Sequence, residues 1–143
     1  MSAEDEVRKA SERFHVALNM MLNGDASQMA GIWSHSAAVT TMHPVGGREV
    51  GWDKVEGPWR ELAKLASEGQ AKLLDQVIHV AGDMGYEVGI EKGQVTLAGQ
   101  RVPIEHRATN IYRREAGGWK IVHHHADVSQ AMLDVLGRLQ GKK

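Results

Sequence analysis

The sequence contains no cysteine, so disulfide bonds and thiolate zinc sites are excluded, and the redox environment of the protein is left open. It also has little net charge, because 17 basic and 18 acidic side chains leave a formal charge of −1. This balance gives no electrostatic basis for binding nucleic acid or an acidic membrane. No apolar run is as long as a transmembrane helix, and the acidic start of the chain argues against a signal peptide. We therefore expect a cytoplasmic protein.

The composition is that of an ordinary globular domain. Of the 143 residues, 42% are apolar and 24% are charged, and the chain is long enough to bury a substantial core. No linker, internal repeat or low-complexity segment interrupts it. We expect a single domain over residues 1–143.

The first half of the chain is mostly helical in pattern. Apolar residues recur at helical spacing in two long segments, and a short helix follows the first of them. Pro58 lies inside the second segment, so we expect a short turn first and the main helix to begin near Gly57 or Pro58. A strand lies between the helices and is broken by a His-Pro-Val-Gly-Gly turn. The predicted ranges are 3–23 and 52–67 for the helices, 37–42 for the strand and 43–47 for the turn.

The second half of the chain reads as a series of strands. β-branched and aromatic residues dominate four segments separated by turns that contain glycine, at residues 71–81, 86–97, 101–114 and 119–127. Gly89 and Gly93 lie inside one of these strands and predict a bend. A last amphipathic helix is expected over 129–139. This order predicts an α+β fold in which a curved antiparallel sheet carries helices on its concave face, forming a cone with an internal pocket.

The hairpin from Thr109 to Asp127 organises these predictions. Side chains alternate between the two faces of a strand, and Ile121 is expected to face the core. By this alternation His123, His125 and Asp127 face the interior with Ile121. The same argument turns His124 outward.

Several short segments resemble one known family. They lie at residues 23–25, 39–47, 51–52, 107–114 and 118–127, and with the order of elements they cover nearly the whole chain up to Asp127. The chain resembles the SnoaL-like, ketosteroid-isomerase-like proteins of the nuclear transport factor 2-like superfamily. The resemblance implies a cone-shaped domain, and this superfold hosts enzymes, binding proteins and assembly domains.

Ketosteroid isomerases carry their general base in an Asp-Pro-Val-Gly segment after the first strand. Here the similar segment is His43-Pro44-Val45-Gly46, so the resemblance implies that His43 stands where the base stands. The oxyanion aspartate of that family falls on or near Thr109, and its tyrosine on the first helix has no counterpart at Phe14 or His15. Steroid isomerisation by that mechanism is therefore not supported.

The predicted catalytic residues are His43, His125 and Asp127. His43 is assigned as base, His123 or His125 as acid, and Asp127 as the group that orients an imidazole. The alternative for His43 is a loop histidine bonded to backbone. His123 and His125, about 6.5 Å apart along a strand, could chelate a metal only with a third ligand. Because no second ligand cluster exists, we predict no metal site.

The predicted ligand-binding residues form an apolar wall and a polar mouth. Arg107 shares a face with Thr109 and Ile111 and could hold a carboxylate or phenolate, or else pair with Glu91, Glu105 or Asp127. The other histidines are predicted to be structural or at the surface. The predicted ligand-binding set is Trp33, Trp52, Trp59, Tyr86, Arg107, Thr109, Ile111 and His123.

Two functions of different class follow. The first is an enzyme that needs no cofactor and performs acid–base chemistry, such as isomerisation, cyclisation, dehydration or hydrolysis, on a small apolar organic molecule. The second is a non-catalytic domain that binds a ligand or dimerises. In either case we expect a homodimer through the outer face of the sheet, where alternation places Tyr112, Val122 and His124.

Overall fold

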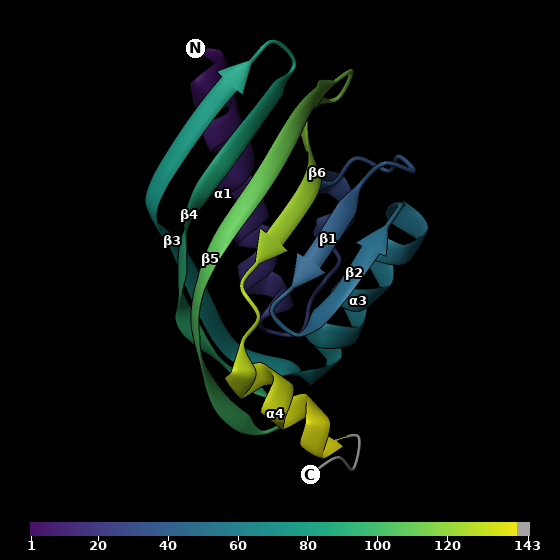
Figure 1. Cartoon of the computed structure of the whole chain (residues 1–143), viewed down its shortest axis with the longest axis vertical. Coiled ribbons are helices and arrows are strands. Elements are labelled where there is room, and N and C mark those ends of the chain that lie inside the picture. Colours follow the sequence, from purple (N-terminus) through teal and green to yellow (C-terminus); the bar gives the residue numbers. More distant parts are fainter. Residues whose placement is uncertain (140–143) are drawn as a thin grey trace.

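A six-stranded sheet forms the frame of the protein, in a computed structural model that describes residues 1–139 (Figure 1). The strand order is β2-β1-β6-β5-β4-β3, and the sheet is curved and does not close. Every neighbouring pair is antiparallel except β1 and β6, which are parallel. The predicted α+β class and the four-stranded meander are confirmed, with one parallel junction added. The strands are β1 (Thr40–His43), β2 (Gly46–Val50), β3 (Ala66–Ala81), β4 (Met84–Leu97), β5 (Gln100–Glu115) and β6 (Gly118–Ala126).

Four helices accompany the sheet within residues 1–139. They are α1 (Ala3–Met21), α2 (Met29–Ile32), α3 (Trp52–Leu65) and α4 (Gln130–Leu139). Helix α1 begins at a capping box between Ser2 and Asp5 and buries Val7, Ala10, Phe14 and Leu18 against the sheet. Helix α4 lies at the end of the molecule where β5 begins (Figure 1). None of the helices in residues 1–139 combines the length and apolar character needed to cross a bilayer.

Strand β2 was absent from the sequence prediction. The turn after His43 is followed at once by a strand that pairs with β1, so β1 and β2 form a hairpin. Gly46 and Gly47 both have positive φ angles, of 90° and 87°, which an L side chain rarely adopts. The glycines therefore allow the chain to reverse direction, as predicted. The residues of the predicted turn, however, already belong in part to β2, which begins at Gly46.

Helix α3 runs without a break through Pro58, so the predicted separate turn over residues 52–56 is wrong. Proline removes one backbone donor and crowds the preceding turn. The helix compensates by burying Val55, Trp59 and Ala63 on one stripe. Gly51, with a φ of 88°, takes the position before its first turn.

The sheet bends where glycine was expected. Strand β3 shifts register between Ser67 and Gln70 and again between Leu74 and Val77, and Gly93 and Gly89 of β4 lie beside these two irregularities. A Cβ atom on Gly93 would lie 1.9 Å from the carbonyl oxygen of Gln70. Close backbone approach at these positions curves β3 and β4, and the curvature creates the concave face on which the helices pack.

Candidate active site

His43 ends β1 and lies inside the cone, with only 6% of its surface exposed. Its ring stands edge-on to Trp59, with 4.7 Å between the ring centroids. Atom Nε2 lies 3.7 Å from Oε1 of Glu49 and makes no hydrogen bond within the described residues. Burial lowers the pKa of His43 despite the nearby Glu49 carboxylate, so the imidazole is neutral at neutral pH.

A bulge in β6 decides which histidines face the cone. Ile111 of β5 pairs with His123, but the next residue, Tyr112, pairs with Ile121, so Val122 has no partner. An extra residue of this kind reverses the alternation of side chains beyond it. The predicted alternation from Ile121 onward is therefore wrong by one residue.

As a result, His124 faces inward and its two neighbours face outward. His124 is 2% exposed, whereas His125 is exposed and His123 is half-buried on the outer side, where its Nδ1 lies 2.7 Å from Oγ1 of Thr40. Asp127 also lies outside. The prediction that His43, His125 and Asp127 converge on one cavity is wrong, and His124 occupies the place predicted for His125.

Arg107 and Asp127 form an ion pair on the outer surface. The Arg107 Nε and Nη2 atoms lie 2.7 and 3.2 Å from the two carboxylate oxygens of Asp127. Hydrogen bonds from Arg107 lower the pKa of Asp127. Arg107 was assigned to the ligand-binding set, with an ion pair left open as the alternative; the structure shows the ion pair with Asp127, and Arg107 is 84% exposed and does not line the cone cavity. Thr109 and Ile111 alternate with buried residues on β5 and share this outer face.

The aromatic residues predicted to form one wall are dispersed. Trp59 lines the cavity, and Trp33 is buried behind it with 6.2 Å between the ring centroids. Trp52 instead borders a separate surface groove of about 380 Å³ between α2 and α3. Tyr86 is 44% exposed on the outer face, where it stacks on His79. Tyr112, predicted to face outward, is fully buried.

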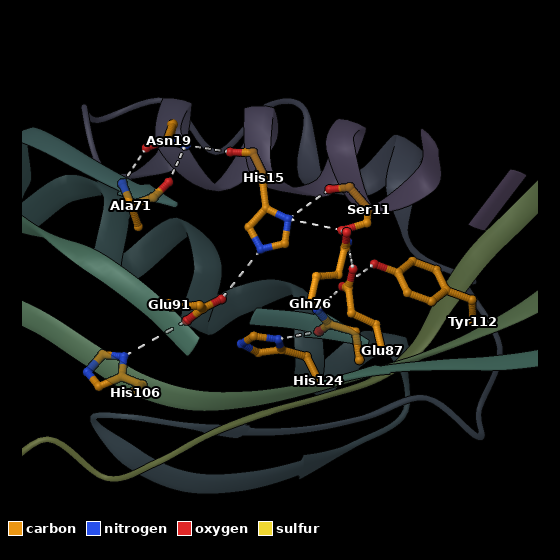
Figure 2. A network of polar contacts seen from close by, with 11 residues as sticks. Ser11, His15, Asn19, Ala71, Gln76, Glu87, Glu91, His106, Tyr112 and His124 are labelled. Carbon is orange, nitrogen blue, oxygen red and sulfur yellow. Dashed lines mark hydrogen bonds and ion pairs between the residues drawn. The ribbon is translucent and has the colours of Figure 1, made fainter. Parts of the chain in front are cut away.

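Glu91 of β4 is the centre of a buried ionic cluster (Figure 2). Its two carboxylate oxygens face His15 of α1 and His106 of β5, at 3.8 Å from Nε2 of His15 and 3.9 Å from Nδ1 of His106. Burial opposes the charge on Glu91, but the two imidazoles outweigh it and hold the pKa of this carboxyl well below its ordinary value. Burial likewise opposes charge on His15, yet Glu91 and the Ser11 carbonyl raise the pKa of His15. The cluster thus holds a carboxylate beside a readily protonated imidazole.

His124 belongs to a second buried cluster. Its Nδ1 lies 2.7 Å from Oδ1 of Asn110, and Nδ2 of Asn110 donates to Glu87 at 3.0 Å. The hydroxyl of Tyr112 also donates to Glu87 at 3.0 Å. Burial lowers the pKa of His124 to about 3 and, with the Glu87 carboxylate, raises the pKa of Tyr112. Both side chains are therefore neutral at neutral pH.

These two clusters and His43 meet at one cavity of about 40 Å³. The rings of His43 and His124 lie 5.9 Å apart between centroids. Four titratable residues line the cavity, and the rest of its wall is mainly apolar. The lining includes His43, Glu91, His106 and His124, together with Leu18, Met21, Leu22, Pro44, Trp59, Leu62, Ala71, Ile104 and Met132.

Sequence reasoning found His43 and Trp59 but missed Glu91, His106 and His124. The signal for β5 was available. Charged or ring-constrained residues at 101, 103, 105 and 107 alternate with Val102, Ile104, His106, Ala108 and Asn110, so the second set had to face the core. The position of His124 had no such signal, because it depends on the bulge at Val122.

The arrangement suits proton transfer. The cavity joins a neutral imidazole to a carboxylate and further imidazoles in a place of low dielectric constant. Among residues 1–139, no group of three or more His, Asp or Glu side chains is arranged to hold a metal ion.

Comparison with known proteins assigns the fold to a family. The family model of the SnoaL-like domain matches residues 7–130, so the chain belongs to the SnoaL-like domain family. No curated protein matches the sequence.

Three solved structures illustrate the range of this fold. A candidate dehydratase of the NTF2-like family from Streptomyces avermitilis is 24% identical, with a TM-score of 0.78 over 90% of this chain and 96% of that one. An NTF2-like superfamily protein from Salmonella enterica serovar Typhimurium is 21% identical, with a TM-score of 0.76 over 89% and 92% of the two chains. A candidate calcium/calmodulin-dependent protein kinase type II association domain from Thiobacillus denitrificans is 28% identical, with a TM-score of 0.65 over 86% and 94%.

Proposed function

We propose that the protein is a cofactor-independent enzyme that performs acid–base chemistry on a small organic molecule in the cone cavity. One observation carries this proposal: buried polar atoms without a hydrogen-bond partner among the described residues gather around that cavity. They are Nε2 of His43, Oε2 of Glu91 and both ring nitrogens of His106. An unsatisfied buried polar group costs roughly 1–3 kcal/mol. A bound molecule with polar groups offsets that cost, and a purely structural core would not accumulate it.

His43 is the proposed base. Its imidazole is neutral and buried beside Trp59, and Nε2 has no hydrogen-bond partner within residues 1–139. A neutral imidazole in a nonaqueous setting can take a proton from carbon or oxygen of a bound molecule.

His106, with the Glu91 carboxylate beside it, is the proposed group that returns the proton. Both residues line the cavity with His43, and the Glu91 carboxylate lies close enough to His106 to stabilise positive charge on that ring during transfer. His15 holds Glu91 from the helix side and keeps it ionised.

The size of the cavity limits the substrate in the closed form. A space of about 40 Å³ holds a water molecule or two, whereas a ring the size of benzene needs a cavity of about 150 Å³. Met132 of α4 and Leu62 of α3 are part of the wall. Helix α4 is joined to the sheet near its start by the hydrogen bond from Ser129 N to Pro44 O. A ring-sized substrate therefore requires part of this wall to move outward.

The comparisons support a reaction of this class. The Streptomyces avermitilis neighbour is named as a candidate dehydratase, and dehydration needs a base to remove a proton and an acid to protonate the leaving hydroxyl. Dehydration is therefore the reaction that we favour among the acid–base candidates.

A general probe of buried bases tests the proposal. Nitrobenzisoxazole loses its C3 proton to a base while its N–O bond breaks, giving a coloured cyanonitrophenolate. The wild-type protein should accelerate this reaction above buffer, and His43→Gln should lower the rate about 100-fold or more. His35→Gln is the matched control, because His35 is exposed and stacks on Trp52 outside the cavity. An unchanged rate in His43→Gln refutes the assigned base, and no acceleration by wild type favours a non-catalytic binding domain.

A homodimer through the outer sheet face remains the second part of the proposal. The outer face carries exposed apolar side chains on β3 and β4, and the Thiobacillus denitrificans neighbour is named as an association domain. Leu74, Val77, Met84 and Tyr86 are each between 43% and 48% exposed, which is typical of a surface that another chain covers. These residues replace Tyr112 and His124, which face inward.

Light scattering after size exclusion tests the assembly. Wild type should elute as a dimer, and Val77→Lys should yield a monomer, because a charge would be buried at the interface. Val16→Lys, on the exposed side of α1, should remain dimeric. A wild-type monomer at micromolar concentration contradicts this part of the proposal.

A further inference from the structure

Arg8, at the surface of the protein, determines which groups donate and which accept in the chain of hydrogen bonds behind the cavity. Nη1 of Arg8 on α1 lies 2.6 Å from Oε1 of Gln76 on β3. A guanidinium group can only donate, so the amide oxygen of Gln76 must face Arg8. The amide nitrogen of Gln76 then faces Glu87 and donates to Oε2 at 2.5 Å.

The same direction continues through Glu87 and Asn110. Glu87 is 1% exposed and accepts from Gln76, Tyr112 and Asn110. A carboxylate has no proton to give, so the Asn110 amide must turn its nitrogen to Glu87. The amide oxygen of Asn110 is thereby left to face Nδ1 of His124 at 2.7 Å.

This fixes the tautomer of His124. An amide oxygen accepts only, so Nδ1 of His124 carries the proton. Burial keeps the pKa of His124 at about 3, so the ring is neutral and has one proton. Nε2 therefore has a free lone pair. In Figure 2 this second ring nitrogen points away from Glu87, toward the side where Glu91 and His106 lie, and all three residues line the cavity.

We propose that Asn110 and Glu87 are positioning residues that lock His124 as a hydrogen-bond acceptor for a hydroxyl group of a neutral ligand. The inference rests on the proposed function, in which a small organic molecule occupies the cavity. His124 Nε2 and Oε2 of Glu91 are both acceptors at this cavity, so the groups of a ligand that contact them must be donors. A phenol or an alcohol meets that requirement. A carboxylate or phosphate ligand places negative charge against Glu91 and is disfavoured.

Long-range ¹⁵N NMR of the histidine rings tests the lock without any ligand. The His124 signals are assigned by their loss in His124→Gln. Wild type should show the Nδ1–H tautomer, and so should Tyr112→Phe, which removes one donor to Glu87 without changing the direction of the chain. In Glu87→Gln the His124 ring should no longer be held in the Nδ1–H tautomer, because a carboxamide can either donate to or accept from Asn110. A wild-type Nε2–H tautomer, or no change in Glu87→Gln, overturns the inference.

Binding of three matched ring compounds tests the ligand class. Phenol should bind the wild-type protein about tenfold more tightly than anisole, which has the same ring but no donor, and benzoate should bind more weakly than phenol. Anisole or benzoate binding as tightly as phenol overturns the inference while leaving the proposed function intact. If none of the three binds, the ligand class assigned here is refuted, and the nitrobenzisoxazole reaction decides the proposed function separately.

Discussion

Gly93→Ala is the substitution for which the geometry makes the sharpest prediction. The added Cβ would lie 1.9 Å from the Gln70 carbonyl oxygen and 2.8 Å from Cα of Ala71, whereas an ordinary contact begins near 3.4 Å. Strands β3 and β4 must separate locally by more than 1 Å, and a hydrogen bond stretched that far is lost. Two lost ladder bonds with partly unsatisfied groups, together with the strain, give a destabilisation of about 3–4 kcal/mol.

Urea unfolding followed by circular dichroism measures this cost, and Gly31→Ala provides a control of opposite sign. A Cβ on Gly31 in helix α2 would meet no atom of the described residues within 4 Å, so alanine should stabilise the protein by about 0.5–1 kcal/mol. The same chemical change should thus lower the free energy of unfolding at one glycine and raise it at the other. A Gly93→Ala protein within about 1 kcal/mol of wild type would refute the view that close backbone approach holds the bend.

Two further predictions concern charge. The pKa of His124 is lower in the folded than in the unfolded protein, where it is about 6.5, so the protein loses stability as the pH falls below that unfolded pKa. Between pH 7.5 and 5.5, the free energy of unfolding of the wild type, measured in urea, should fall by about 1 kcal/mol more than that of His124→Gln. Arg107→Ala removes an ion pair whose arginine is 84% exposed, so the urea midpoint and the nitrobenzisoxazole rate should both stay unchanged. A clear fall in that rate would restore the ligand-binding role predicted for Arg107.

The order of elements was predictable because it depends on local patterns. The spacing of apolar residues predicted α1, and the glycine-containing turns predicted the four-stranded meander. Gly89 and Gly93 predicted the bend in β4. Strand β2 was missed because Gly46 and Gly47 signal a turn whether or not a strand follows. The continuous α3 was missed because burial of its stripe outweighs Pro58, and only the tertiary structure contains that burial.

The candidate site was less predictable because it depends on pairing between distant strands. His43 was found through its Pro-Val-Gly context at the end of a strand. Glu91 could not be distinguished from any other strand glutamate until His15 and His106 were brought to it from α1 and β5. His124 was assigned to the wrong face because the alternation was extended through Val122, which is a bulge residue with no pairing residue on β5.

The bulge at Val122 also affects how this chain should be aligned with its relatives. In a relative whose last strand is regular, the inward residue after the equivalent of Ile121 comes two positions later. Here it comes three positions later, at His124. An ungapped alignment would match that relative's inward residue with His123, which faces out. Placing a one-residue gap at Val122 matches it with His124, so any transfer of catalytic roles onto the three consecutive histidines depends on that gap.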